Sequence, residues 1–421
     1  MRKCPVLLCL AFLTTLVAQP AFEAGAARRI ITPDPLLPVS GGMGTPSPSK
    51  SKRGELMARA MVVRSGTESV AIVSLDLLGF PSVLGDRVRA LVPRIAPENI
   101  LIGSTHSHSA PDCYAYPDGK GGHTGSLEYM QFVVTRAAAA VNDALDHMKP
   151  AELRAASGEA KGKIAYNYYA PDLYDRRVGV LQVRGTDGSA IATLVNYAIH
   201  PEVLGSGLGI VSPDLVGPLE DAVEKSAGGM ALFMNGAQGG MVTADNRNLD
   251  QPRDPLRGYW NDSRTWEECL RIGGLLASES LRVLEPATWQ KNPVLKVYSD
   301  MVRFPVESDD MWAVVEYSPL KYPHGDRTVT ARMNLVMLGN AQILTIPGEA
   351  LPNIGMYLKR KMQGEHKFIF GLTNDAFGYI LTKVDFHSFA RYDYVTRTSL
   401  GEMTGEIVME HALALIEKSK H

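Results

Sequence analysis

Short apolar runs alternate with longer amphipathic segments along the whole chain. The short runs are rich in β-branched residues and stop at turn-forming residues, which is typical of buried strands. A strand-like segment also stands near the start, at residues 29–31. The main strands are expected at residues 60–63, 69–78, 99–105, 177–184, 190–198, 231–235, 294–306, 329–338, 341–346 and 368–372.

The longer segments predict helices. Residues 127–148 are rich in alanine and contain neither glycine nor proline, which strongly favours a helix. Further helices are expected at residues 86–92, 215–225, 266–283, 351–362 and 400–418. Strands and helices interleave to the end of the chain, and no low-complexity linker separates them. The pattern therefore predicts an α/β fold, a single large catalytic unit with a mixed β-sheet core and flanking helices.

The first residues have the pattern of a secretory signal peptide. Arg2 and Lys3 precede an apolar run at residues 6–17, and small residues follow it. The run is shorter than the roughly 20 residues of a membrane span, which disfavours the alternative of an uncleaved anchor. We expect residues 1–25 to be a signal peptide, with the cleavage site left open, and residues 26–421 to be the catalytic domain. The protein is then secreted or periplasmic.

Composition excludes several classes of protein. Lys plus Arg is 43 and Asp plus Glu is 45, so there is no basic excess for binding nucleic acid. Beyond the leader only Cys113 and Cys269 remain, and their spacing leaves open whether they form a disulfide. No CxxC motif is present, which disfavours a cysteine-based metal site.

Two histidines mark the end of the strand expected at residues 99–105. His106 and His108 lie within Thr105–Pro111, and in an extended segment they would lie on the same side. Two such histidines can share one metal ion, or one can bind it while the other supports the site. The alternative is two histidines that are merely hydrogen-bonded in a loop, because an isolated HxH pattern is common.

Three other polar positions follow expected strands. His200 follows residues 190–198, Glu349 follows residues 341–346, and Tyr379 lies beyond the strand at residues 368–372. Functional groups of α/β proteins gather at strand ends, and two histidines with a carboxylate form the ligand set of many hydrolytic zinc sites. A helix cap for Glu349 and a core position for Tyr379 are the alternatives. The HExxH, GxSxG, GxxxxGK[ST] and GxGxxG motifs are absent, which weighs against several common enzyme classes.

The order of these motifs resembles the catalytic domain of the neutral (alkaline, non-lysosomal) ceramidases. The pieces that carry the resemblance span residues 28–401: Ile31-Thr32-Pro33, Gly41-Gly42, Arg59-Ala60, Val73-Ser74-Leu75-Asp76, Ser104 to Ser109, Asp175 to Leu181, His200, Asn235 to Gly239, Pro347-Gly348-Glu349 and Gly378-Tyr379. The resemblance implies a Zn²⁺ ion held by His106, His200, Glu349 and Tyr379. It also implies catalytic roles for His108 and Tyr392.

The chain also departs from the family's pattern. Tyr168 stands where family members carry an arginine that contacts the substrate, and Gly240 stands in place of an aspartate. We expect no counterpart here of the C-terminal immunoglobulin-like domain of the full ceramidases. Tyr168 is therefore the expected substrate-binding residue. The resemblance supports the zinc site more strongly than it supports ceramide as the substrate.

The resemblance implies a secreted zinc-dependent amidohydrolase that cleaves an amide (N-acyl) bond with metal-activated water. Its partner would be a small-molecule or lipid-like substrate, with peripheral contact to membrane lipid and no nucleic acid. Tyr168 favours a first alternative, in which the same zinc site hydrolyses an ester or a carbohydrate-linked amide. Gly240 favours a second, a secreted binding protein without catalysis.

Overall fold

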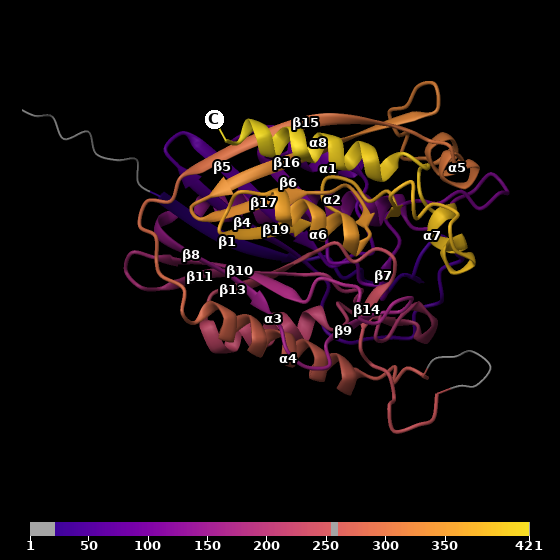
Figure 1. The fold of residues 1–421 in the computed structure, drawn as a ribbon, viewed down its shortest axis with the longest axis horizontal. Helices are drawn as coiled ribbons and strands as arrows, with labels where there is room; N and C mark the ends of the chain where they lie inside the picture. Colours follow the sequence, from indigo (N-terminus) through magenta and orange to yellow (C-terminus); the bar gives the residue numbers. More distant parts are fainter. Residues whose placement is uncertain (1–21, 254–259, 421) are drawn as a thin grey trace, which may run out of the picture.

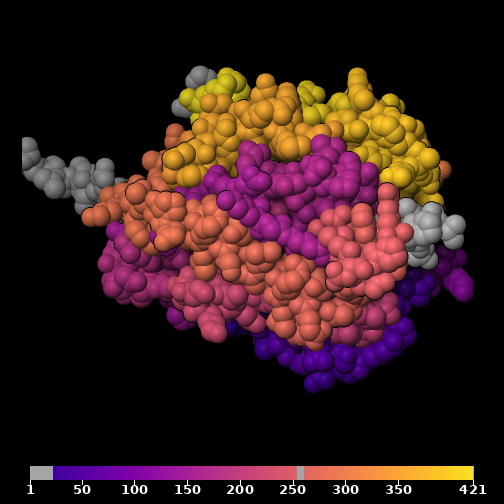
Figure 2. All heavy atoms as spheres, turned by 60° about the horizontal axis from the view of Figure 1, so that its bottom comes forward, coloured from indigo at the N-terminus to yellow at the C-terminus, as the bar shows by residue number. Residues whose placement is uncertain are grey.

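The computed structural model describes residues 22–253 and 260–420. Two β-sheets pack face to face, and helices cover the outer face of each (Figure 1). Helices α3 (Val216–Ala227) and α4 (Trp266–Leu284) lie on one side, and α6 (Pro352–Lys361) and α8 (Thr404–Lys418) on the opposite side. The predicted α/β fold, with a mixed sheet core and flanking helices, is confirmed. In the space-filling view the yellow and orange C-terminal segments pack directly against the magenta middle of the chain (Figure 2).

The larger sheet has eight strands. Their order across the sheet is β13 (Met230–Asn235), β11 (Ala190–Tyr197), β10 (Arg177–Gly185), β8 (Lys149–Glu159), β1 (Phe22–Ile30), β4 (Met57–Ser65), β5 (Glu68–Leu75) and β6 (Ile100–Ser104). The pairs β11–β13 and β5–β6 are parallel, and the others are antiparallel. Side chains alternate between the faces: Val180 and Val195 pack against α3 and α4, while Leu181 and Leu194 face the second sheet.

The larger sheet curves until its two edges meet. The Ser74 hydroxyl of β5 donates to the Phe233 carbonyl of β13, and the Asn235 amide donates to the Thr105 carbonyl just beyond β6. These contacts join segments that lie at opposite ends of the strand order. The carboxyl ends of β6, β11 and β13 therefore converge at one place.

The smaller sheet has four strands. Their order is β15 (Leu295–Pro305), β16 (Thr328–Leu338), β17 (Ala341–Thr345) and β19 (His366–Phe370). The Asn196 side chain fixes this sheet to the larger one, because it donates to the carbonyls of Met234 and Ile369. Since β17 and β19 are parallel, the loops that follow them leave the sheet at the same end.

The remaining helices and strands complete the fold. The helices are α1 (Ser82–Ala90), α2 (Leu127–Asp146), α5 (Asp309–Tyr317), α7 (Asp393–Arg397), η1 (Pro97–Asn99), η2 (Ser206–Leu208) and η3 (Ala390–Tyr392). The strands are β2 (Val39–Ser40), β3 (Ser51–Lys52), β7 (Ala110–Pro111), β9 (Ala165–Asn167), β12 (Ile210–Val211), β14 (Val242–Ala244), β18 (Glu349–Ala350) and β20 (Tyr379–Ile380). Strand β8 and helix α5 are additions to the elements expected from sequence. No helix of the described residues is both long enough and apolar enough to span a membrane.

Strand β1 begins within the segment assigned to the signal peptide. Phe22 pairs with Ser65, and the side chains of Phe22 and Ala24 are buried. Residues 22–25 are thus part of the larger sheet, while residues 1–21 of the expected leader lie outside the described residues. Cys113 and Cys269 are both free and buried, and they belong to different hydrophobic clusters.

Candidate metal centre

Three histidine side chains meet where the edges of the larger sheet converge. The ring nitrogens of His106, His108 and His200 all lie within 4.8 Å of one another and could hold a metal ion. The His106 ring centroid is 4.7 Å from those of both other rings. His106 and His108 follow β6, and His200 follows β11, so the curvature of the sheet creates the cluster.

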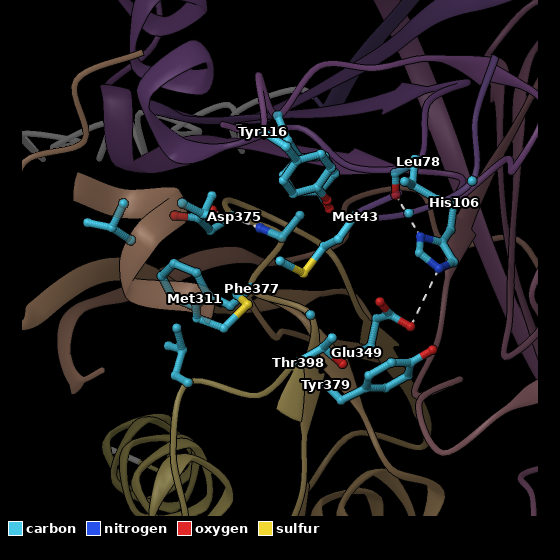
Figure 3. Close-up of a pocket in the computed structure, with 18 of the residues that line it drawn as sticks. Met43, Leu78, His106, Tyr116, Met311, Glu349, Asp375, Phe377, Tyr379 and Thr398 are labelled. Atoms are coloured by element: carbon cyan, nitrogen blue, oxygen red, sulfur yellow. Dashed lines mark hydrogen bonds and ion pairs between the residues drawn. The ribbon is translucent and has the colours of Figure 1, made fainter. Parts of the chain in front are cut away.

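Glu349 completes the centre from the smaller sheet. One of its oxygens, Oε2, lies 3.1 Å from His200 Nε2. The same oxygen is 3.4 Å from His106 Nε2, a contact that Figure 3 marks with a dashed line. The other ring nitrogen of each histidine faces a backbone carbonyl: His106 Nδ1 is 2.6 Å from Leu78 O, and His200 Nδ1 is 2.9 Å from Val242 O. Because a carbonyl only accepts, both Nδ1 atoms donate, and a neutral ring then presents the lone pair of Nε2 to the carboxylate.

This arrangement fits a divalent metal ion. Two Nε2 lone pairs and a carboxylate oxygen repel one another unless a cation or extra protons lie between them. Without an ion, the Glu349 carboxylate faces the two histidine rings. Burial disfavours its ionised form, but His106 and His200 outweigh burial and keep the pKa of Glu349 well below the ordinary value. In a tetrahedral zinc site with bonds of about 2.0–2.2 Å, neighbouring donors lie roughly 3.3–3.6 Å apart. The spacings of 3.1 and 3.4 Å are close to that range.

The backbone at His106 differs from the expected extended segment. His106 has φ of 70°, in the left-handed region that residues other than glycine seldom adopt. The Thr105 and His106 amides donate to the carbonyls of Leu75 and Leu77 and hold this turn in place. The prediction of strand-like alternation from His106 to His108 was therefore wrong. The two rings meet because of the turn, and such strained positions cluster at functional sites.

Asn235 fixes the two histidine-bearing loops relative to each other. Its side-chain nitrogen donates to Thr105 O at 3.0 Å and to Ile199 O at 2.7 Å, and its oxygen accepts from the amide of Ile199 at 3.2 Å. Thr105 and Ile199 directly precede His106 and His200. In the sequence, Asn235 stands out only as part of a motif that resembles the ceramidase family. Its contacts with both histidine-bearing loops could not be inferred from the end of one strand.

His108 lies in a polar corner with Glu202, which sequence analysis did not identify. His108 Nδ1 is 3.8 Å from Glu202 Oε2, and the buried Nε2 makes no hydrogen bond to the described residues. Burial, followed by His106, lowers the pKa of His108 to about 3. Burial raises the pKa of Glu202, but His108 and His200 outweigh it, so this pKa lies below its ordinary value. The spacing His200-Pro201-Glu202 was the available signal.

Tyr379 lies directly opposite Glu349. The two residues are register partners in the parallel pair β18–β20, and the Tyr379 hydroxyl donates to Met241 Sδ at 2.9 Å. Burial, followed by the charge of Glu349, raises the pKa of Tyr379 well above its ordinary value. The backbone of Gly239 also packs closely on Glu349, since a Cβ there would lie 2.0 Å from Glu349 O. The structure thus brings His106, His108, His200, Glu349 and Tyr379 together.

A cavity of about 70 Å³ adjoins this centre. Its lining includes Tyr394, whereas Tyr392 and Tyr168 are not among the lining residues. Tyr392 instead packs against Tyr169, with ring centroids 5.3 Å apart, and Tyr168 is 38% exposed. Residues 392 and 394 lie in the helical segment η3–α7, where positions two apart point in nearly opposite directions. Our choice of Tyr392 therefore selected the tyrosine that faces away from the cavity.

Comparison with solved structures shows which fold this is. The neutral ceramidase from Pseudomonas aeruginosa superposes with a TM-score of 0.73 at 15% identity, over 95% of this chain and 75% of that one. A ceramidase complexed with C2 gives a TM-score of 0.74 at 15% identity, over 95% and 76%. No protein-family model and no curated protein matches the sequence. The chain has the fold of neutral ceramidase.

Proposed function

We propose that this protein is a zinc-dependent amidohydrolase, secreted or periplasmic, that cleaves an N-acyl bond. The observation that carries the proposal is the contact of one Glu349 oxygen with Nε2 of both His106 and His200, while each Nδ1 is held by a carbonyl. The fold of neutral ceramidase supports an amide as the bond that is cleaved.

His106, His200 and Glu349 would hold the zinc ion, with Tyr379 as the fourth ligand. Nitrogen and oxygen donors of this kind suit zinc, and a site closed by tyrosine is weaker than one closed by thiolate. When bound, zinc supplies a Lewis acid that polarises a carbonyl and makes water a nucleophile near neutral pH.

Tyr394 and His108 would act on the substrate directly. Burial, followed by Glu349 and Glu202, raises the pKa of Tyr394 to about 12, so its hydroxyl keeps its proton and can donate to a carbonyl oxygen that gains negative charge. His108 presents a buried ring nitrogen without a partner among the described residues, beside Glu202. That nitrogen can take a proton from the attacking water and pass it to the departing amine.

The neighbours' names make ceramide, a sphingolipid, the first substrate to test. Both are ceramidases, and one of them is complexed with C2. Peripheral contact with membrane lipid would accompany a substrate of this kind. Tyr168, in place of an arginine, favours the alternative of an ester or a carbohydrate-linked amide.

The test begins with the metal content of the purified protein. We expect zinc near one ion per chain, lost in His200→Ala and kept in the matched control His123→Ala, whose histidine is exposed. The zinc-loaded protein is then assayed with ceramide, simpler N-acyl amines and matching esters. A metal-free protein without activity would refute the proposal and favour a binding protein. Hydrolysis of esters alone would favour the alternative substrate class.

A further inference from the structure

An apolar chamber lies beside the candidate metal centre. It is the part of the cavity walled by Leu78, Tyr114, Tyr116, Val314 and Phe377, all of them less than 10% exposed (Figure 3). The chamber starts directly at the centre, because the Leu78 carbonyl is the group that holds His106 Nδ1. A group attached to a carbonyl carbon at the centre would therefore enter this chamber first.

The chamber is small. The whole cavity has a volume of about 70 Å³. A protein cavity of about 150 Å³ accommodates benzene, with six carbon atoms. On that scale the space here holds a group of about three non-hydrogen atoms, which is the size of an acetyl group.

The walls are held firmly. The rings of Tyr114 and Tyr116 stack with centroids 4.8 Å apart, and Asp112 accepts from the amides of Tyr114 and Ala115. The Tyr114 hydroxyl lies so close to Gly79 that a Cβ there would be 1.8 Å away. The ring therefore has no room to swing toward Gly79.

Helix α5 closes the opposite side. Its Val314 is buried against Tyr114 and Tyr116, while Met311 lies at the mouth of the cavity. The helix is fixed at its start, where the Ser308 hydroxyl accepts from the Met311 amide and Arg327 pairs with Asp309 at 2.9 Å. Since the wall of Tyr114 and Tyr116 and the opposite wall of helix α5 are both held in place, a longer acyl chain would overpack the chamber rather than widen it.

The chemistry of the walls selects the acyl side of the bond. Burial raises the pKa of Tyr114 and Tyr116 well above the ordinary value, so neither phenol carries charge near neutral pH. Asp375 also lines the cavity, and burial raises the pKa of its carboxyl to about 7. A departing amine becomes an ammonium ion, which is costly to bury in an apolar site. The alkyl end of an acyl group is the part that fits. The amine side faces the mouth of the cavity, where Met43 and Tyr394 are 38% and 43% exposed.

We propose that this enzyme removes short acyl groups, acetyl or propionyl, and discriminates against long-chain substrates. The inference rests on the proposed amidohydrolase function and narrows its substrate class. In the reaction the C–N bond breaks, and the oxygen of one water molecule joins the acyl carbon. Both protons of that water end on the nitrogen, so the products are a short carboxylate and an ammonium ion.

The experiment compares one amine carrying different acyl groups. The zinc-loaded protein is assayed with N-acetyl, N-butanoyl, N-octanoyl and N-palmitoyl derivatives of 7-amino-4-methylcoumarin. We expect the highest kcat/KM for acetyl and a value at least about 10-fold lower for octanoyl, since a single methylene is worth roughly 10 to 200-fold in a fitted pocket. Equal or faster hydrolysis of the long chains would overturn the inference while leaving the amidohydrolase function intact. Hydrolysis of none of them would refute the proposed function itself.

Two cavity variants, one control variant and a binding measurement locate the effect. Val314→Ala should reduce the acetyl preference over octanoyl by at least about fivefold, because a wall side chain is shortened. Met311→Ala at the mouth is the second variant if Val314→Ala does not fold. Tyr317→Ala, on the exposed face of the same helix, should leave the preference unchanged. By calorimetry, acetohydroxamate should bind the zinc-loaded protein at least about 10-fold more tightly than octanohydroxamate. The reverse order would contradict the inference without reference to turnover.

Discussion

The side-chain nitrogen of Asn235 donates to Thr105 O at 3.0 Å, across the seam where the two edges of the larger sheet meet. The same nitrogen donates to Ile199 O at 2.7 Å. A single buried amide therefore sets the distance between the loop of His106 and the loop of His200. The metal centre depends on this residue although the residue contacts no metal ligand side chain.

Replacing Asn235 with aspartate tests that dependence. The variant keeps the shape of the side chain but removes both donated hydrogen bonds, and two buried carbonyls lose their partner at about 1–3 kcal/mol each. We expect Asn235→Asp to lower the free energy of unfolding by roughly 3 kcal/mol in denaturant titrations and to weaken zinc binding at least about 10-fold in chelator competition.

The matched control is Asn196→Asp. Asn196 donates to the carbonyls of Met234, Asn235 and Ile369, and these hydrogen bonds do not include the carbonyls of Thr105 and Ile199. This variant should lose stability by a similar amount, yet it should bind zinc more tightly than Asn235→Asp does. Wild-type zinc affinity in Asn235→Asp would show that the seam does not position the ligands.

The two histidines of the HxH motif are expected to differ in their effect on the metal. His106 Nε2 faces Glu349, whereas His108 faces Glu202. His106→Ala should therefore abolish zinc retention and activity together. His108→Ala should keep most of the zinc and lower kcat by about 10 to 100-fold, as expected for a group that supports a metal site. Equal loss of zinc from both variants would identify His108 as a ligand.

Local pattern was sufficient for most of the individual elements. Residues 127–148 were expected to be a helix because alanine dominates them, and α2 spans Leu127–Asp146. Strand β8 was missed because its buried positions, such as Ala151 and Ala155, are alanines, which have low strand propensity. Helix α5 was missed because nine residues give too short an apolar pattern.

Long-range relations were the part that sequence alone could not supply. The strand-end rule grouped His106, His200 and Glu349, and the structure brings these residues together. Strands β6 and β13 lie at opposite edges of the eight-stranded sheet. No pattern in the sequence indicated that these two edges would meet. Which of Tyr392 and Tyr394 lines the cavity likewise depends on a helical segment of only a few residues. Its sequence pattern is too short to predict which of its side chains face the cavity.

Those two tyrosines make a matched pair for kinetics. Tyr394 lines the cavity with Glu349, and its hydroxyl keeps its proton because burial raises its pKa to about 12. Under the proposed mechanism, Tyr394→Phe should lower kcat by about 100-fold, the effect of losing one donor to a developing oxyanion. Tyr392→Phe should stay within about threefold of wild type. A larger effect at Tyr392 would show that the side chains rearrange around the substrate.

The start of the folded domain can be tested by truncation. Phe22 is 2% exposed and Ala24 is fully buried, and both lie in β1. A chain that begins at Ala26 lacks both side chains, and loss of a buried phenylalanine alone costs about 3–5 kcal/mol. We expect that chain to unfold at clearly lower denaturant concentration than one beginning at Phe22. Under the proposed export, N-terminal sequencing of the mature protein should find cleavage at or before Phe22, and a mature terminus at Ala26 would contradict this.

Acid stability should depend on a buried ion pair. Asp175 lies 2.9 Å from Lys359 Nζ and also pairs with Arg177. Burial raises the pKa of Asp175, but Lys359 and Arg177 outweigh burial and lower it to about 2. The ordinary value for an unfolded aspartate is about 3.9. Between these two values the unfolded chain binds more protons than the folded one.

The sign of the pH dependence follows from that difference. The stabilisation from Asp175 is fully present above about pH 4 and is lost as pH falls toward 2, and its size is about 2 kcal/mol. Asp175→Asn should be less stable than wild type at pH 7, by about 3 kcal/mol, because Lys359 is left buried without its charge partner. The gap between the two proteins should narrow by about 2 kcal/mol between pH 5 and pH 2.5.

Urea unfolding of the metal-free proteins across this pH range measures the gap. The exposed Asp172→Asn is the control, and its profile should run parallel to that of wild type. A constant gap between wild type and Asp175→Asn would mean that Asp175 titrates alike in the folded and unfolded chains. The ion pair with Lys359 would then contribute to packing, and its contribution to the free energy of unfolding would not depend on pH.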